Sequence, residues 1–308
     1  MTNKIVAIQG NHPSKLNPKT DTSVFLAHEI QNKNYKIFYY DPKKLSVINS
    51  EVIASGFFIK FDYKDKNFFK ILKKQKLALT KCKFILIRQD PPFNLEYISA
   101  TYILDTIKDK VKILNNPTSI RNISEKLYSV RYQKFMPSTI FTQNISEIKN
   151  FFKTHKKVII KPIHSYGGND IHLLNRFNSK FINQFIKKHD HIMCQKFLPK
   201  INKGDKRVFL INGKVCGAIS RVPKQGSFLS NMSKGAKPIS IELTKTEKKI
   251  SKLIAKDLKK ENIFFAGIDF IDQKLNGDIN VTSPTGLKTL YDLSGINLAK
   301  TFWKELKA

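Results

Sequence analysis

Three polar residues in the last quarter of the sequence have the types and spacing of a divalent-cation site. Asp269 follows the apolar run FFAGI, and Asp278 and Asn280 lie in the segment DINVT. These runs flank Asn276-Gly277, which predicts a β-hairpin with a loop of two residues (276–277) or four (274–277). Because side chains alternate between the faces of a strand, either loop places all three residues on one face. Two carboxylates and an amide oxygen there suit Mg²⁺, and an ordinary solvent-facing strand that carries acids is the alternative.

A glycine turn follows a predicted strand in the middle of the chain. Lys161 ends the run VIIK, and Ser165-Tyr166-Gly167-Gly168 comes shortly after it. The backbone N–H groups of such a turn can contact phosphate. Gly-Gly turns also commonly do no more than join two strands, so this turn by itself predicts no ligand.

The few arginines are a further guide to binding positions. Only six of the 55 basic residues are arginine, and the planar arginine fork binds carboxylate or phosphate through paired hydrogen bonds that lysine cannot make. Arg88 and Asp90 follow the apolar run KFILI, at the end of a strand where ligands bind in parallel sheets. Asp205 and Arg207 open another predicted strand, where a surface ion pair is the alternative.

The elements that must position these residues follow two patterns. In the first third, strand and helix signals alternate, which predicts an open, mostly parallel α/β sheet. Its expected elements are strands at 4–8, 36–40 and within 83–93, helices at 22–33 and 96–107, and a hairpin over 46–61 around Asn49-Ser50. From residue 131 the pattern is α+β. Its expected elements are strands at 156–162, 169–174 and 191–199, a hairpin around Asn212-Gly213, helices at 178–189 and 245–260, and a closing segment at 294–306. We therefore expect two domains, 1–120 and 121–308, the second divided at about residue 200.

Composition excludes several classes of protein. The net charge of +31 comes mainly from lysines spread along the whole chain, with no basic arm or tail, so we interpret it as solvated faces and do not expect a nucleic-acid partner. The three cysteines have no CxxC spacing, which argues against a disulfide framework or a zinc site. The start MTNKIVAIQG is too short for a signal peptide, and no apolar run reaches the ~20 residues of a membrane span. We expect a soluble, cytoplasmic protein with no membrane partner.

Six segments together resemble bacterial glutathione synthetase, a family of ATP-grasp ligases. They are ILIRQDPPFNLEYISATYILD (85–105), NNPTSIRNISEKL (115–127), VIIKPIHSYGGNDI (158–171), QKFLPKINKGDKRVFLINGK (195–214), AGIDFI (266–271) and DINVTSPTG (278–286). RQDPPF and INVTSPTG are highly specific to that family, and the match runs from residue 4 to about residue 300. The resemblance implies an α/β ATP-grasp fold over 121–308, preceded by a substrate-binding domain over 1–120.

The resemblance also implies a role for each matching residue. ATP-binding residues would be Lys126, Lys161, Gly167, Gly168, Lys196, Phe197, Leu198 and Asp205. Substrate-binding residues would be Arg88, Asp90, Arg221, Ser283, Pro284, Thr285 and Gly286. Arg207 would be the catalytic residue, and Asp269, Asp278 and Asn280 would hold two Mg²⁺ ions, with Mn²⁺ as an alternative. The family tends to form tetramers, which implies a homo-oligomer by analogy.

The reaction implied is the ATP-dependent ligation of γ-glutamylcysteine and glycine through an acyl phosphate. Because acyl phosphates hydrolyse readily, a lid that excludes water is expected, and the loop 222–238 is placed to form it. This loop departs from the family pattern, with Leu229 and Ser230 where an arginine and a glycine are usual, and Ala236 where a glycine is usual. His164-Ser165 stands for Asp-Gly, Gly10-Asn11 for Met-Asp, and Asp278 for Glu after an apparent one-residue insertion. These departures keep two alternatives open: a related carboxylate–amine ligase with another peptide or amine substrate, and a lysine-rich nucleic-acid-binding protein on the same fold.

Overall fold

The apolar runs at the start of the chain form a seven-stranded sheet. The computed structural model describes residues 4–308. The strands are β1 Ile5–Gln9, β2 Lys36–Tyr40, β3 Leu45–Ile48, β4 Glu51–Phe61, β5 Phe69–Ala78, β6 Phe84–Ile87 and β7 Lys112–Leu114. The four strands β2-β1-β6-β7 are parallel, as predicted, and β3, β4 and β5 extend one edge in antiparallel order. The predicted turn at Asn49-Ser50 is confirmed, since both residues have positive φ.

Helices α1 Thr22–Gln31 and α2 Leu95–Asp105 belong to this sheet, and α3 Pro117–Asn122 leads away from it. Each begins at a side-chain cap: Asp21 accepts a hydrogen bond from the Val24 N–H, Asn94 from Tyr97 and Asn116 from Ser119. No helix within residues 4–308 is long and apolar enough to cross a membrane.

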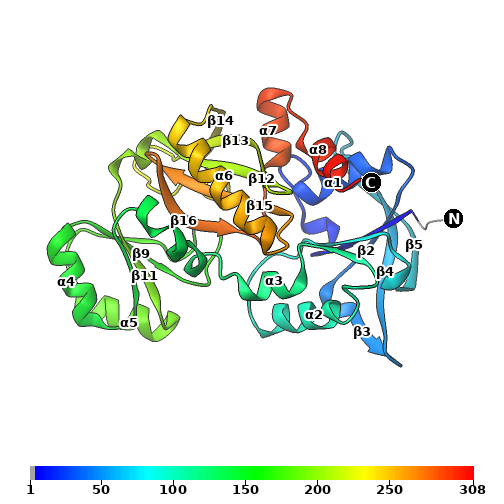
Figure 1. Cartoon of the computed structure of the whole chain (residues 1–308), viewed down its shortest axis with the longest axis horizontal. Coiled ribbons are helices and arrows are strands. Elements are labelled where there is room, and N and C mark those ends of the chain that lie inside the picture. The colour runs from blue at the N-terminus through cyan, green and yellow to red at the C-terminus, as the bar shows by residue number, and fades with distance from the viewer. Residues whose placement is uncertain (1–3) are drawn as a thin grey trace.

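A four-stranded antiparallel sheet forms the small lobe at the left of Figure 1. Its strands are β8 Thr139–Thr142, β9 Val158–Pro162, β10 His172–Leu174 and β11 Ile192–Lys196, in the order β10-β9-β11-β8. Helices α4 Ile145–His155 and α5 Ser179–His189 bury Ile148 and Ile182 against it. The amphipathic spacing of both helices explains this packing, because each presents one apolar stripe to the sheet.

The third sheet carries most of the polar residues singled out by the sequence. Its strands are β12 Asp205–Ile211, β13 Lys214–Val222, β14 Lys237–Ser240, β15 Phe265–Ile271 and β16 Lys274–Asn280, in the order β14-β13-β12-β15-β16. Helix α6 Lys245–Lys260 covers one face of it and buries Ile250, Ile254 and Leu258 (Figure 1). The predicted bounds of α6 are confirmed.

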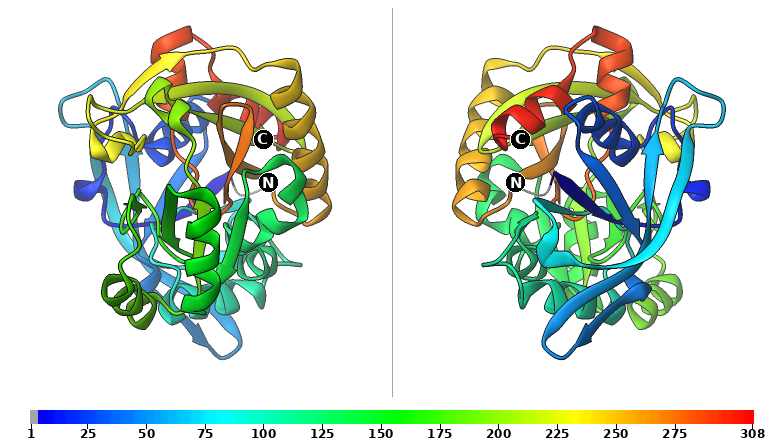
Figure 2. Two further views of the ribbon diagram at one scale, coloured as in Figure 1. Left: turned by 90° about the vertical axis from the view of Figure 1, so that its left-hand side faces the viewer. Right: turned by 90° about the vertical axis from the view of Figure 1, so that its right-hand side faces the viewer.

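The last two helices return to the first sheet. Helices α7 Leu287–Ser294 and α8 Leu298–Glu305 lie beside α1, and the Trp303 indole N–H donates to the Leu26 carbonyl at 2.9 Å (Figure 2). Phe302 and Trp303 share one buried cluster with Val6, Ile8 and other residues of the first sheet. The closing segment of the chain thus joins the two halves of the molecule, and the boundary at residue 120 stays a prediction.

The predicted hairpin turn at Asn276-Gly277 is wrong. The turn is Asp272-Gln273, both with positive φ, and β16 begins at Lys274. Between the pairs Ile268↔Ile279 and Phe270↔Leu275, one residue of β15 faces three of β16, so Asn276-Gly277 lies in a bulge. Gly277 has a φ of 88°. The glycine is therefore needed for a left-handed backbone conformation, but in the bulge and not in the hairpin turn that the sequence predicted. The register shifts by two residues, an even number, so Asp269, Asp278 and Asn280 stay on the same face of the hairpin, as predicted.

Candidate active site

Four buried charges form an ion-pair network across three neighbouring strands. Strand register places Arg207 of β12 directly opposite Asp269 of β15, and Asp205 of β12 opposite Arg221 of β13. The Arg207 guanidinium donates two hydrogen bonds to Asp269, one of them at 2.8 Å, and Arg221 binds both Asp205 and Asp269. Each side chain is at most 8% exposed. A buried charge is stable only with a partner, so each member of the network depends on the others.

Burial and pairing act in opposite directions on the two carboxylates. Burial by itself would raise the pKa of Asp269, but Arg207 and Arg221 outweigh it and hold that pKa at about 2. Asp205 has Arg221 as its main partner, and burial prevails, so the pKa of Asp205 lies above its usual value. Asp269 is therefore the firmly ionised member of the network at neutral pH.

A second charge cluster joins the small lobe to β16. The Lys126 and Lys161 Nζ atoms lie 3.5 Å from the two carboxylate oxygens of Asp278. Lys126 also donates to the Ser165 carbonyl at 2.8 Å, and Lys161 donates to the Asn276 carbonyl at 3.0 Å. Burial opposes ionisation of Asp278, but both lysines together lower its pKa. These lysines come from separate segments, so Asp278 orients them toward one point.

The three predicted metal ligands lie on the same side of the β15–β16 hairpin. Asp269 and Asp278 are close enough to influence each other's ionisation, and the Asn280 amide nitrogen donates to the Gly267 carbonyl at 3.1 Å. Within residues 4–308 no group of three or more His, Cys, Asp or Glu side chains could hold a metal ion, and the candidate set here contains two carboxylates and one amide. Two carboxylates and an amide oxygen are hard donors that fit a divalent cation. Arginine and lysine side chains neutralise the two carboxylates. To hold a cation, Asp269 and Asp278 would have to give up part of these ion pairs.

A cavity of about 60 Å³ lies between the small lobe and the third sheet. Its wall includes Lys161 of β9 and the predicted adenine-binding residues Lys196, which ends β11, and Phe197 and Leu198, which follow it. Phe228 and Leu229 of the loop between β13 and β14 also line it. Leu229, which stands where the family usually has an arginine, thus lines the predicted nucleotide cavity.

A larger cavity of about 480 Å³ lies between the first sheet and the third. Its wall includes Arg207, Arg221 and Asn280 from the third sheet, and Asp90 and Asp21 from the N-terminal half. Further predicted residues on this wall are Gly167, Ser283, Pro284 and Thr285. Arg88 is not on the wall: it is buried behind it, its Nε donates to Ser23 at 3.1 Å, and its Nη1 has no hydrogen-bond partner among the described residues.

The loop 223–236 contacts the glycine turn. Lys234 Nζ donates to Asn169 at 2.8 Å, and the Ser233 hydroxyl contacts the Gly167 carbonyl at 3.4 Å. Gly168 has a φ of 76°, and a Cβ atom there would lie 2.4 Å from Asn231 Oδ1, so another residue would strain the backbone and displace the Asn231 side chain. Gly286 caps α7 with a φ of 115°, and its N–H donates to Thr22 at 3.2 Å. It therefore shapes the turn after Thr285, but it is absent from the cavity wall.

Sequence reasoning missed two residues that organise the site. The Asn115 amide bonds the Phe265 and Val281 carbonyls and accepts from the Phe264 and Phe265 N–H groups. The Glu125 carboxylate accepts three hydrogen bonds from Val281 and Thr282. Both residues lie in the segment 115–127 that carries part of the family resemblance. Their hydrogen-bond partners are 149–166 positions away, so no local pattern could have revealed these contacts.

The three sheets together form an ATP-grasp fold. The structure is similar to that of the ATP-grasp ligase PsnB complexed with minimal precursor, with a TM-score of 0.65 at 13% identity. The similarity covers 99% of this chain and 98% of the PsnB chain. It is similar to D-alanyl-alanine synthetase A from Vibrio cholerae with a TM-score of 0.63 at 14% identity, over 100% of this chain and 98% of that one. At these identities the likeness establishes the fold.

Two family models identify the particular family. The prokaryotic glutathione synthetase N-terminal domain matches residues 5–121, and the prokaryotic glutathione synthetase ATP-grasp domain matches residues 125–295. The glutathione synthetase of Bradyrhizobium diazoefficiens is 33% identical over 98% of this chain and 97% of its own length. That of Buchnera aphidicola subsp. Baizongia pistaciae is 34% identical over 93% of this chain and 90% of its own length. The chain belongs to the prokaryotic glutathione synthetase family.

Proposed function

We propose that this protein joins γ-glutamylcysteine and glycine into glutathione at the expense of ATP. Family membership supports this reaction. The observation that carries the proposal is the convergence of Lys126, Lys161 and Asp278 with the Arg207–Asp269 pair beside a large polar cavity. Phosphoryl transfer requires positioning and charge neutralisation more than covalent help from the protein, and this arrangement supplies both.

The two cavities suit the two parts of the reaction. The smaller one would take the adenine, with β11 and the residues after it binding the base through backbone groups. Lys126 and Lys161 would then contact the phosphates, with Gly167 and Gly168 covering them and Asp205 near the ribose. The larger cavity would take the dipeptide and glycine, with Asp90, Arg221 and residues 283–285 in its wall, Gly286 shaping the turn after them and Arg88 supporting the wall from behind.

Arg207 is placed to stabilise charge that develops during the reaction. The dipeptide carboxylate takes the γ-phosphoryl group of ATP, and the glycine nitrogen then displaces phosphate from the acyl phosphate. Arg207 lines the cavity where this occurs, and Asp269 fixes the orientation of its guanidinium. Asp269, Asp278 and Asn280 would hold a divalent cation, which would supply positive charge to offset the negative charge of the phosphates. We propose Mg²⁺ for this role, with Mn²⁺ as the alternative.

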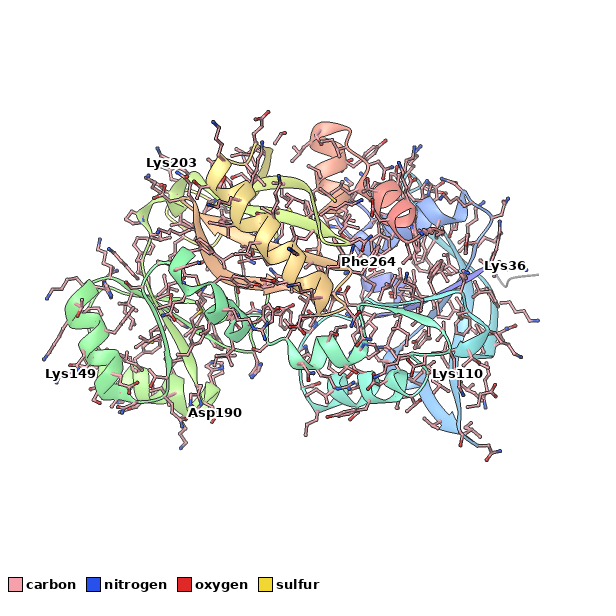
Figure 3. All side chains as sticks on the ribbon, viewed as in Figure 1. Lys36, Lys110, Lys149, Asp190, Lys203 and Phe264 are labelled. Atoms are coloured by element: carbon pink, nitrogen blue, oxygen red, sulfur yellow. The ribbon has the colours of Figure 1, made fainter. Side chains whose placement is uncertain are left out.

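Four further proposals rest on family analogy or on sequence alone. We propose the domain division 1–120 and 121–308, and a homotetramer with small-molecule substrates as its ligands. We also propose a cytoplasmic location and no nucleic-acid partner. Exposed lysines such as Lys36, Lys110, Lys149 and Lys203 lie far apart on the molecule, which supports the last of these (Figure 3).

The experiment that tests the function is direct. Purified protein is mixed with ATP, γ-glutamylcysteine, glycine and Mg²⁺, and glutathione is measured by mass spectrometry alongside phosphate release. Formation of glutathione and phosphate in equal amounts supports the proposal. Phosphate release without glutathione would contradict it.

One observation favours a second candidate, a ligase with a different dipeptide or amine. Asn11 donates to Asp90 at 2.7 Å at the edge of the larger cavity, where the family usually has Met-Asp in place of Gly10-Asn11. This bond uses one oxygen of a carboxylate that would otherwise be free for substrate. A screen of γ-glutamyl dipeptides and amino acids separates the two candidates, because product with another pair and none with glycine would support the second.

A further inference from the structure

The two carboxylate oxygens of Glu125 have different environments. Oε1 accepts hydrogen bonds from the Val281 N–H at 2.8 Å, the Thr282 N–H at 3.0 Å and the Thr282 hydroxyl at 2.9 Å. The Glu125 carbonyl accepts a further bond from the Ile279 N–H at 3.0 Å. Oε2 has no hydrogen-bond partner among residues 4–308, and it is not sealed from solvent. One oxygen is therefore fixed by the protein while the other is available to a ligand.

Glu125 lines the larger cavity and also a neighbouring hollow beside His164 and Ser165. The next residue, Lys126, contacts Asp278, and the segment that Glu125 holds directly follows Asn280. Arg207 and Asn280 line the same cavity. Glu125 is thus the acidic wall residue that is connected to the groups around the transferred phosphoryl group.

The other two carboxylates on this wall are engaged by neighbouring groups of the protein. Asp21 caps helix α1 by accepting from the Val24 N–H at 2.8 Å. Asp90 accepts from Asn11, and both carboxylates lie near the buried Arg88 guanidinium. Their negative charge is therefore balanced locally, whereas Glu125, which also lines this cavity, has no ion-pair partner among residues 4–308.

We propose that Glu125 is a specificity-determining residue that binds the ammonium group of the amine substrate and holds it beside the acyl phosphate. This inference rests on the proposed function, because it assigns the position of the second substrate in that reaction. An amino acid carries a positive ammonium group at neutral pH, and a carboxylate is the side chain that binds it through charge-assisted hydrogen bonds. Fixing Oε1 to the 281–282 backbone would hold Oε2 ready for that contact.

The test replaces one oxygen and keeps the other. In Glu125→Gln the amide oxygen can still accept the three bonds from Val281 and Thr282, while an NH₂ group replaces Oε2. Activity is measured with two nucleophiles: glycine, which is cationic, and hydroxylamine, which is largely uncharged at neutral pH and traps the acyl phosphate as a hydroxamate. We expect kcat/KM for glycine to fall by about 10- to 100-fold, the usual effect of losing a hydrogen bond to a charged group. Hydroxamate formation and the KM for ATP should stay within about threefold of wild type.

Two other outcomes would overturn the inference. Equal losses with glycine and with hydroxylamine would mean that Glu125 only supports the backbone near Asn280, and unchanged glycine kinetics would mean that the amine binds elsewhere. Glu247→Gln is the matched control, because Glu247 is a buried glutamate of α6 paired with Lys206 on the far side of the sheet. The wild-type reaction tests the proposed function separately: if wild type uses another amine in place of glycine, the same comparison is made with that amine against hydroxylamine.

Discussion

The buried face of β12, β15 and β16 and the exposed face of α6 use charge in opposite ways. On the buried face, Arg207 and Asp269 are at most 6% exposed and pair with each other, and the equally buried Lys161 of β9 pairs with Asp278. On α6 the exposed lysines outnumber the acids. The acids of this helix are Asp257, which is partly exposed, and Glu247, which is buried. The exposed lysines are Lys245, Lys248, Lys249, Lys252, Lys256, Lys259 and Lys260.

The difference follows from the cost of removing a charge from water. A buried charge without a partner is strongly unfavourable, so the site must be neutralised before any substrate binds. A lysine on the surface remains solvated and needs no partner. The net charge of +31 therefore says little about function, whereas the few paired charges in the interior form the candidate site.

Removal of the Asp278 charge should have the largest effect. Asp278→Asn deletes a proposed metal ligand and leaves Lys126 and Lys161 without their shared carboxylate. We expect turnover to fall by about 10³-fold, as for the loss of a strong electrostatic contact in a transition state, with the fold retained. Turnover is measured across a Mg²⁺ titration. Asp272→Asn, at the hairpin turn and paired with surface Lys200, is the control; near-normal activity of Asp278→Asn would exclude a metal role.

Arg207→Lys tests whether fork geometry matters in the interior. Lysine keeps the charge but cannot make both bonds to Asp269. We expect kcat to fall by about 10²-fold while the Kd for ATP changes much less, because Arg207 lines the reaction cavity and not the nucleotide cavity. Arg131→Lys, in an exposed pair with Glu261, should leave both unchanged. Equal losses of ATP affinity and turnover would contradict the assignment.

The pH dependence of stability sharpens the comparison inside the network. The pKa of Asp269 is about 2 in the folded protein against 3.8 without the fold, so its contribution to stability is complete above about pH 4 and is lost as the pH falls toward 2. Asp269→Asn should lower the free energy of unfolding by about 3–5 kcal/mol at neutral pH. Urea unfolding at several pH values should show this difference shrinking below about pH 4.

Asp205→Asn provides the opposite sign for the same measurement. Burial raises the pKa of Asp205, so protonation of this side chain at low pH favours the folded wild type. The difference in the free energy of unfolding between wild type and Asp205→Asn should therefore not shrink below about pH 4. Parallel curves for the two variants would show that the two carboxylates are not distinguished by their partners.

Much of the fold could be predicted because its elements have strong local patterns. The strand at 36–40 and the helix at 245–260 have the predicted bounds, since one is a continuous apolar run and the other has a regular apolar stripe. Strand β5 was missed because FKILKKQKLA carries lysines on both faces and a bulge interrupts its pairing with β4. Helix α7 was missed because it begins at Gly286 without a side-chain cap.

The site was predictable only in part, for a related reason. Parity along strands is a local property, so the common side of Asp269, Asp278 and Asn280 could be deduced although the turn was misplaced. The pairing of Arg221 with Asp269 depends on three strands meeting, and the role of Glu125 depends on contact with residues more than 150 positions away. Such contacts arise from tertiary structure, and spacing in the sequence does not report them.

A contact at the edge of the site should have a smaller effect than those in its interior. Lys234→Ala removes the bond to Asn169 that joins the loop 223–236 to the glycine turn. Because Lys234 is exposed, the bond contributes no more than about 1 kcal/mol, and we expect the KM for ATP to rise by about two- to fivefold with little change in kcat. Steady-state kinetics measure both constants, with Lys249→Ala on α6 as the control. A loss of kcat as large as that of Arg207→Lys would mean that this bond belongs to the catalytic core.

The lysines of α6 should matter least. The combined change of Lys248, Lys249, Lys252 and Lys256 to Gln removes four positive charges from one exposed face. We expect kcat and KM to be unchanged and the free energy of unfolding to shift by less than about 0.5 kcal/mol per site, because exposed positions without specific partners contribute little. Binding to duplex DNA or RNA, measured by fluorescence anisotropy, should be absent above about 0.15 M salt in wild type and variant alike. Tight binding by wild type at that salt, lost in the variant with a reduced salt dependence, would instead identify this face as a nucleic-acid surface.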